Sequence, residues 1–202
     1  YSSAASDVYK RQDYMYYGHL LNALKKYDEA VMQYQKAIEL DTSKTELWRE
    51  ISNAYEQKND YTDAIVAYQK YYEALPADEQ TADLQFQIGK LYYGKGTQSD
   101  TLTVSLDERK AALVSADSVF AVIAQAAPDS YLGNFWRARA NSALDPETTQ
   151  GLAKPYYEEV AALLVNKNDP RYNSALVECY SYLGYYYLVA NKLPESKEYW
   201  NK

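Results

Sequence analysis

Apolar side chains recur along most of this chain with the period of an α-helix, most clearly between residues 45 and 78. Trp48, Ile51 and Tyr55 stand at i, i+3 and i+7, so they share one face of a predicted helix. A second stripe follows, formed by Ile65, Tyr68 and Tyr72. The pattern therefore predicts two successive helices in this stretch.

The residues between and around these stripes predict a helical hairpin. Lys58-Asn59-Asp60 makes a short polar turn between the helices. Ala64 is small enough to let the second helix approach the first closely, and Pro76 ends that helix because proline cannot continue a helix interior. A single hairpin cannot bury both of its faces, so we expect stacked neighbours.

The spacing Trp48-x2-Ile51-Ser52-x2-Tyr55, Ala64-x3-Tyr68, Pro76 resembles the tetratricopeptide repeat, or TPR, with Ser for the usual Gly and Tyr for the usual Phe. Related first-helix spacings recur at Tyr14, Tyr17, Gly18 and Leu21, and at Tyr180, Leu183, Gly184 and Tyr187. The resemblance implies an all-α fold, a right-handed α-solenoid of antiparallel helix pairs. About five units are expected, the last of them incomplete.

The same spacings predict the organisation of the chain. A single TPR-like solenoid is expected over 13–202, with units at about 11–44, 45–78, 79–128, 129–168 and 169–202. A loop is predicted at 94–106, where Gly, Ser and Thr are frequent. Residues 1–12 show no apolar period, and residues 7–12 among them resemble a translated transposon-end adapter from sequencing libraries. Residues 1–12 are therefore predicted to be a non-native or disordered leader.

Because the last predicted unit stops within its second helix, we expect a fragment of a longer bacterial TPR protein that lacks the native N-terminus. What lies beyond Lys202 and the oligomeric state are open at this point. Asp145–Glu159 resembles a segment of long bacterial envelope repeat proteins. The compartment stays open without the native start, with the periplasm or cell envelope favoured over the cytoplasm.

Composition narrows the function classes. The 202 residues carry a net charge of -7 with both signs mixed, whereas a nucleic-acid binder would carry a basic face. No apolar run reaches the length of about 18 residues that a membrane span needs. Tyr is frequent, with 24 residues against 3 Phe and 3 Trp, and its apolar ring and hydroxyl suit recognition. The single Cys179 falls in a helical stripe and is predicted to be a packed thiol.

The search for catalytic chemistry gives no candidate. His19 is the only histidine, so neither a catalytic triad nor a multi-histidine metal site is available. Gly89-x4-Gly94-Lys95 nearly spells a phosphate-binding loop, but Gly96 stands where the motif needs Ser or Thr. We predict no enzyme, no cofactor and no metal.

The family resemblance implies a binding groove, because the first helix of each hairpin lines the concave face in TPR domains. In the first unit the groove positions of the family fall on Gln12, Met15, Tyr16, His19, Asn22 and Ala23. The predicted peptide-binding residues of the first three units are Tyr16, His19, Arg49, Glu50, Asn53, Phe86, Gln87, Lys90 and Tyr93. The alternative for any one of them is an ordinary solvated helix face.

One TPR subfamily holds the C-terminal carboxylate of chaperones with Lys, Asn and Arg at set positions. The matching positions here are Met15, His19, Glu50, Asp83 and Gln87. None carries the expected residue, and the two acidic ones would repel a carboxylate. The sequence thus predicts a scaffold for a protein or peptide other than a chaperone tail. The alternative is a purely structural helical segment that supports another module of a longer envelope protein; the partner's identity stays open.

Overall fold

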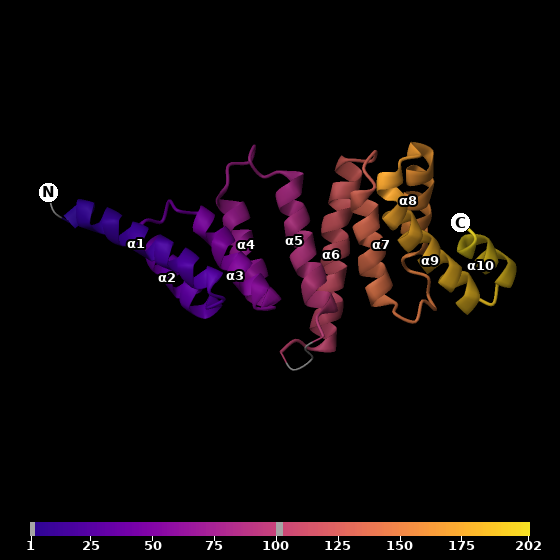
Figure 1. Cartoon of the computed structure of the whole chain (residues 1–202), viewed down its shortest axis with the longest axis horizontal. Coiled ribbons are helices and arrows are strands. Elements are labelled where there is room, and N and C mark those ends of the chain that lie inside the picture. The colour runs from indigo at the N-terminus through magenta and orange to yellow at the C-terminus, as the bar shows by residue number, and fades with distance from the viewer. Residues whose placement is uncertain (1–2, 100–102) are drawn as a thin grey trace. The chain divides into compact units, whose positions relative to one another are not determined.

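The computed structural model of the chain describes residues 3–99 and 103–202, with side chains from Tyr9 onward (Figure 1). All regular structure in these residues is helical. The chain divides into two compact units, Tyr1–Lys95 and Gly96–Lys202, called unit 1 and unit 2 below. The prediction of an all-α fold is confirmed.

Unit 1 is a succession of packed helices: α1 (Ser3–Ala23), α2 (Tyr27–Leu40), α3 (Glu46–Gln57), α4 (Tyr61–Ala74) and most of α5 (Ala82–Thr97). Each helix from α1 to α4 packs against the next. On α5, Leu91 joins the buried cluster of Ala64, Ile65 and Tyr68 from α4. Short turns reverse the chain between α1 and α2 and between α3 and α4, which makes them hairpins (Figure 1).

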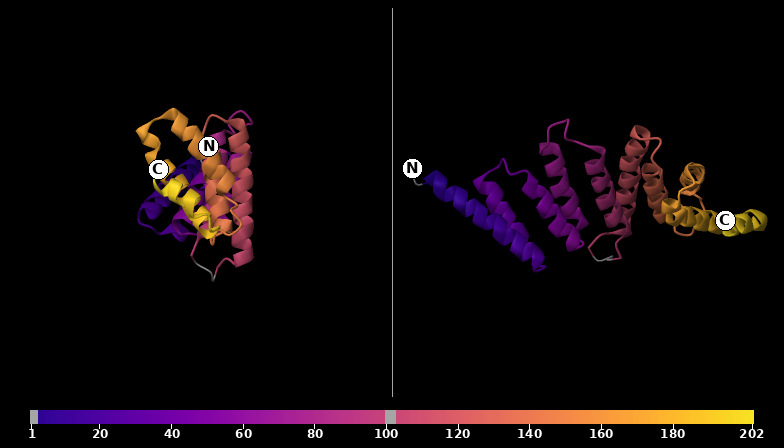
Figure 2. Two further views of the ribbon diagram at one scale, coloured as in Figure 1. Left: turned by 90° about the vertical axis from the view of Figure 1, so that its right-hand side faces the viewer. Right: turned by 45° about the horizontal axis from the view of Figure 1, so that its top comes forward.

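Unit 2 repeats this construction with α6 (Leu106–Ala126), α7 (Leu132–Leu144), α8 (Lys154–Lys167), the 3-10 turn η1 (Pro170–Tyr172), α9 (Asn173–Val189) and α10 (Leu193–Trp200). Consecutive helices pack against one another, and α6 and α7 run side by side in the right-hand view of Figure 2. Ser105 begins α6 with a capping box, in which its hydroxyl and the Glu108 carboxylate each accept a backbone N–H of the other residue.

The predicted loop at 94–106 is wrong at its start, because α5 continues through Gly94 to Thr97. Packing explains the glycine there: a Cβ on Gly94 would lie 2.3 Å from Cε1 of Tyr61. Of the predicted loop, residues 98–99 and 103–105 are irregular, and 100–102 lie outside the described residues. The glycine that indicated a loop therefore serves a close contact inside a helix.

The leader predicted over 1–12 also looks different in the structure. Helix α1 begins at Ser3, so the described part of this segment is helical and continuous with the first hairpin. Residues 1 and 2 lie outside the described residues. The non-native origin of the leader stays a prediction.

The two helices of a hairpin cross at a small residue with an aromatic ring packed on it. At Gly18 of α1, a Cβ would lie 2.6 Å from Cε1 of Tyr34, and at Gly184 of α9 it would lie 2.8 Å from Cε2 of Trp200. Ser52 holds the same place in α3 as these glycines, counted from the repeat spacing. Because this residue is a serine, it brings a hydroxyl group to the place where α3 and α4 cross.

That hydroxyl bonds the backbone of the facing helix. Ser52 Oγ donates to the carbonyl of Ala64 at 2.8 Å, in a buried position. The α9–α10 hairpin has an equivalent bond, but its serine is on the second helix. Ser196 Oγ of α10 donates to the carbonyl of Gly184 of α9 at 2.8 Å. A buried polar group is stabilising when it is hydrogen-bonded, so both hairpins gain a directional contact where their helices are closest.

We predict that Gly18→Ala destabilises unit 1 while Gly184→Ala is close to neutral. Tyr34 is fully buried and cannot yield, so the new methyl should cost roughly 1–3 kcal/mol, partly offset by the roughly 0.5–1 kcal/mol that Ala gains over Gly in a helix. Trp200 is 54% exposed and can move aside. Urea unfolding followed by circular dichroism measures both variants; an equal loss for the two would contradict this account.

Candidate functional site

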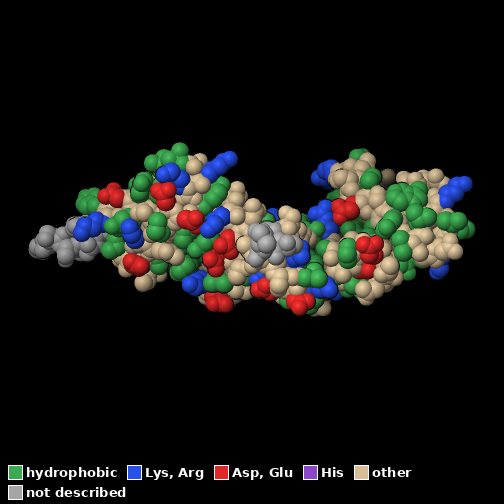
Figure 3. Space-filling view, turned by 90° about the horizontal axis from the view of Figure 1, so that it is seen from below, with side chains coloured by type: hydrophobic (Ala, Val, Ile, Leu, Met, Phe, Trp, Pro, Cys, Tyr) green, Lys and Arg blue, Asp and Glu red, His purple; other side chains and the backbone are tan. Residues whose placement is uncertain are grey.

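The predicted groove residues all lie in unit 1, on the first helix of each hairpin. Helix α1 carries Tyr16 and His19, α3 carries Arg49, Glu50 and Asn53, and α5 carries Phe86, Gln87, Lys90 and Tyr93. Figure 3 shows one face of the chain, on which acidic and basic side chains are mixed without a large area of one sign.

A pocket of about 150 Å³ lies beside α1. Its lining consists of Arg11, Gln12, Met15, Tyr16, His19 and Lys44. Four of these residues, namely Gln12, Met15, Tyr16 and His19, occupy positions that the family resemblance assigns to the groove in the first predicted repeat (11–44). Tyr16 is 71% exposed at the pocket, and Arg11 is held by an ion pair with Asp41.

His19 and Glu50 come together around the buried Tyr34. The Tyr34 hydroxyl oxygen lies 3.0 Å from His19 Nδ1, and the two rings meet edge to face with centroids 5.3 Å apart. Burial and, to a smaller extent, the negative charge of Glu50 together raise the pKa of Tyr34 to about 12. The hydroxyl therefore stays protonated at neutral pH and is able to donate to a neutral His19. Three helices thus meet at one polar point.

Arg49 precedes Glu50 on α3 and contacts α4. Its guanidinium is 5.5 Å from the ring centroid of Tyr71 on α4, within the range of a cation–π contact. One of its nitrogens is 3.9 Å from Glu50, a long ion-pair distance. Asn53, one turn along α3, is exposed. These side chains are oriented by neighbours and still reach solvent.

Helix α5 is fixed against α4 by two amide-to-phenol hydrogen bonds. Gln85 Nε2 donates to the Tyr72 hydroxyl at 2.8 Å, and Gln69 Nε2 donates to the Tyr92 hydroxyl at 3.2 Å. Of the predicted groove residues on this helix, Gln87 is exposed and the other three are half-buried. Tyr72 and Tyr92 illustrate one role of the many tyrosines in this chain: each is half-buried, and its hydroxyl accepts a hydrogen bond from the neighbouring helix.

Unit 2 contains a polar network that sequence reasoning missed. Arg139 of α7 makes a bidentate ion pair with Glu178 of α9, with distances of 2.8 and 2.7 Å, and the Tyr157 hydroxyl of α8 donates to the same carboxylate at 3.0 Å. The partners are far apart in sequence and share no motif. Only the folded arrangement shows that these charges satisfy one another.

A second group lies between α6, α7 and α8. Arg137 donates to Asp117 at 3.0 Å and to the Tyr156 hydroxyl at 2.9 Å, and Asn141 Nδ2 donates to Asp117 at 2.9 Å. The Arg137 guanidinium also lies 4.3 Å from the centroid of the Tyr156 ring. Arg137 is therefore held on three sides within unit 2.

Asp145 organises the turn between α7 and α8. Its buried carboxylate accepts the backbone N–H groups of Thr149, Gln150 and Gly151 at 3.1, 2.9 and 2.8 Å. Gly151 has a φ of 67°, a left-handed conformation that glycine adopts readily. Three backbone donors compensate the burial of one charge.

Potential metal ligands and the single thiol were located in the described part of the chain. No three His, Cys, Asp or Glu side chains there are grouped to hold a metal ion. Cys179 is fully buried, and burial raises the pKa of its thiol from 9.0 to about 12. Among the same residues, no helix has the length and apolar character to cross a membrane.

Solved structures with similar folds are TPR proteins. The C-terminal part of a TPR repeat-containing protein from Cytophaga hutchinsonii superposes with a TM-score of 0.71 at 29% identity, over 95% of this chain and 67% of that one. MamA from Desulfovibrio magneticus RS-1 gives a TM-score of 0.61 at 13% identity, over 95% and 92% of the two chains. Their fold is one that generally carries no catalysis and suits protein partners.

YrrB, described as a TPR protein with an unusual peptide-binding site, gives a TM-score of 0.55 at 15% identity, over 93% of this chain and 81% of YrrB. At that identity the likeness concerns the fold alone. No protein-family model matches the chain, and no curated protein matches it by sequence.

We predict that Cys179 resists thiol reagents in the folded chain and that stability falls in alkaline solution. Between pH 9.0 and about 12 an unfolded Cys179 would lose a proton that the folded one keeps, so rising pH favours unfolding. Tyr34 acts in the same sense, with a pKa raised from 10.0 to about 12. Ellman's reagent at about pH 8, with and without urea, tests the first point. Melting curves from about pH 8 to 11 test the second; rapid labelling without urea or a flat profile would contradict it.

Proposed function

Since this chain is a tetratricopeptide-repeat protein, we propose that it acts without catalysis as a protein-interaction scaffold that binds a peptide or protein segment along the first helices of unit 1. The groove is defined by the nine predicted residues on α1, α3 and α5. The observation that carries the proposal is the pocket beside α1, where Tyr16 and His19 meet Gln12 and Met15.

The chemistry of this pocket suits one side chain of an extended or helical peptide. Met15 and Tyr16 offer apolar area, and Tyr16 has few rotatable bonds to freeze. His19 and Gln12 add hydrogen-bonding groups at its rim. Because a few well-placed anchors carry most of an interface's energy, a pocket with an exposed ring beside it is a reasonable centre for binding.

Farther along the groove, polar groups can bind the peptide backbone. Asn53 and Gln87 are exposed, and their amides both donate and accept hydrogen bonds. Arg49 and Lys90 provide positive charge, whereas Glu50 and Asp83 provide negative charge nearby. A terminal carboxylate gains no consistent attraction from this mixture, so the proposed ligand is an internal peptide segment.

For unit 2, the polar network favours the alternative function, that of a purely structural helical segment without a ligand. Arg139, Glu178 and Tyr157 satisfy one another, and so do Arg137 and Asp117. Charges that are paired within the fold have to lose those partners before they contact a ligand. We propose that the Arg139–Glu178 network stabilises unit 2 and that the peptide binds in unit 1.

We predict that the groove variants Phe86→Ala and Asn53→Ala each weaken peptide binding about five- to thirtyfold, or roughly 1–2 kcal/mol. Peptides selected from a random library on the immobilised chain serve as ligands, and fluorescence anisotropy gives the affinities. Their Kd should be on the order of micromolar. Asn53 is exposed, so its variant should keep full stability, whereas half-buried Phe86 should lose a little.

The matched controls are Met32→Ala on α2 and Val66→Ala on α4. Both residues are exposed apolar side chains of second helices, 51% and 47% exposed respectively, in the same unit. These variants should bind the selected peptides as the unchanged protein does. Full affinity in the Phe86→Ala, Asn53→Ala double variant, or crosslinks confined to α2 and α4, would refute the groove.

A further inference from the structure

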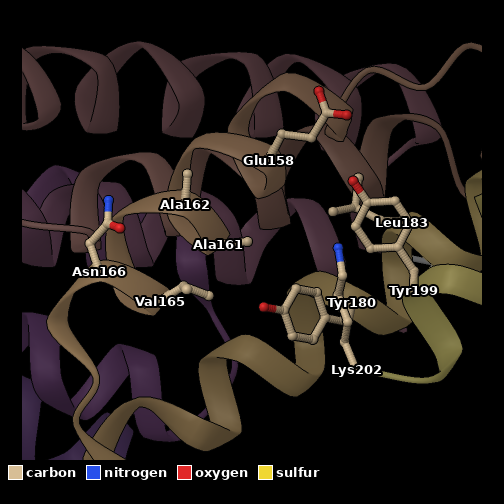
Figure 4. A pocket seen from close by; sticks show the side chains of 9 residues that line it. All are labelled: Glu158, Ala161, Ala162, Val165, Asn166, Tyr180, Leu183, Tyr199 and Lys202. Carbon is tan, nitrogen blue, oxygen red and sulfur yellow. The ribbon is translucent and has the colours of Figure 1, made fainter.

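Unit 2 has a pocket of about 300 Å³ between α8, α9 and α10, and none of its lining residues belongs to the proposed groove (Figure 4). Its apolar lining consists of Ala161, Ala162, Val165 and Leu183. Polar groups at the rim come from Glu158, Asn166, Tyr180, Tyr199 and Lys202. The pocket therefore combines an aliphatic surface with two aromatic rings and one carboxylate.

A cation already occupies the aromatic part of this pocket. The Lys202 ammonium lies 4.4 Å from the ring centroid of Tyr199 and 5.7 Å from that of Tyr180, as the close-up in Figure 4 lets the reader follow. It also lies 3.1 Å from Glu198 Oε1, an exposed side chain one turn earlier. Rings at these distances attract a positive charge through the negative potential of their faces.

The carboxylate of Glu158 adds negative charge on the α8 side. It is 2.8 Å from the Lys154 ammonium and accepts the Tyr187 hydroxyl at 3.5 Å. Tyr187 in turn stacks on Tyr199, with centroids 5.6 Å apart and planes 8° from parallel. Glu158 and Tyr199 thus both line the pocket, and Tyr187 connects them from behind.

We propose that this pocket binds a lysine side chain of a partner protein, and that Lys202 holds the place of that lysine until the partner displaces it. The four-carbon stem would lie on Ala161, Ala162 and Val165, with the ammonium over Tyr199 and Tyr180. Long basic side chains bury their stems on apolar surface in this way and keep the charged end in a polar setting.

The site is independent of the proposed peptide groove, because all of its residues belong to unit 2. It would act as an additional contact for a basic segment of a bound protein. A single lysine side chain should bind weakly, in the millimolar range, since exposed cation–π contacts contribute little and Lys202 competes for the rings.

The experiment titrates the full 202-residue chain with Nα-acetyl-lysine methylamide and follows the aromatic NMR signals of Tyr180 and Tyr199. Lys202→Gln removes the competing ammonium, so it should bind the probe at least about threefold more tightly than the unchanged chain. In Lys202→Gln, adding Tyr199→Leu should abolish the signal changes. Amide spectra confirm that each variant is folded.

Charge is tested by a matched pair on α8, each change made in the Lys202→Gln background. Glu158→Gln should weaken probe binding roughly threefold or more, whereas Glu159→Gln, which removes the same charge from an exposed residue outside this pocket, should not. Nα-acetyl-norleucine methylamide carries the apolar stem without the ammonium and should not bind measurably.

Three outcomes would overturn the proposal. The first is unchanged Tyr180 and Tyr199 signals in Lys202→Gln at about 20 mM probe, well above a millimolar Kd. The second is equal binding of the norleucine compound, which would mean an apolar cavity without cation selectivity. The third is tighter binding of the corresponding arginine derivative, which would reassign the partner side chain.

Discussion

The close crossing of the two helices in each hairpin is the contact on which the rest of this structure depends. Gly18 and Gly184 leave room for an aromatic ring of the facing helix, and Ser52, at the same place in the α3–α4 hairpin, contacts the backbone of Ala64. The buried serine hydroxyls add a bond to the facing backbone at the same place. Interiors packed at crystal-like density allow little adjustment, so one methyl group matters there.

The crossing also decides which side chains are available for binding. Once one face of a first helix is committed to the second helix, residues such as Tyr16 and Asn53 are left exposed. In unit 1 these faces carry a pocket and exposed amides. In unit 2 the charged residues of α7 and α9 pair with one another. Two units of one fold thus use their polar residues differently.

Much of the helical architecture was predictable from the sequence, because the apolar period and the small-residue positions are local signals. Trp48, Ile51 and Tyr55 fixed the third helix and Ala64 the fourth, and both helices are where the spacing placed them. Gly94 misled the prediction because glycine signals a loop when its neighbours are unknown. Its packing against Tyr61 depends on a residue more than thirty positions away.

The candidate site was predictable in part. The family spacing placed Gln12, Met15, Tyr16 and His19 on one face, and they line one pocket. The same spacing gave no sign of Tyr34 beneath His19, nor of Glu178 opposite Arg139, since nothing in one helix records which charge a distant helix presents. Asp145 was overlooked for a related reason: its partners are backbone N–H groups, which leave no trace in residue types.

The serine at the helix crossing has a consequence for how such chains can be recombined. The hydroxyl comes from the first helix in the α3–α4 hairpin and from the second in the α9–α10 hairpin. A chimera that paired α3 with α10 would bring Ser52 and Ser196 to one crossing. In the natural hairpins each crossing holds only one such hydroxyl, bonded to a carbonyl of the facing helix. A chimera that paired α9 with α4 would bring Gly184 against Ala64 and have no hydroxyl at all. Exchanging whole hairpins would therefore keep these serine contacts, whereas exchanging single helices would lose or duplicate them.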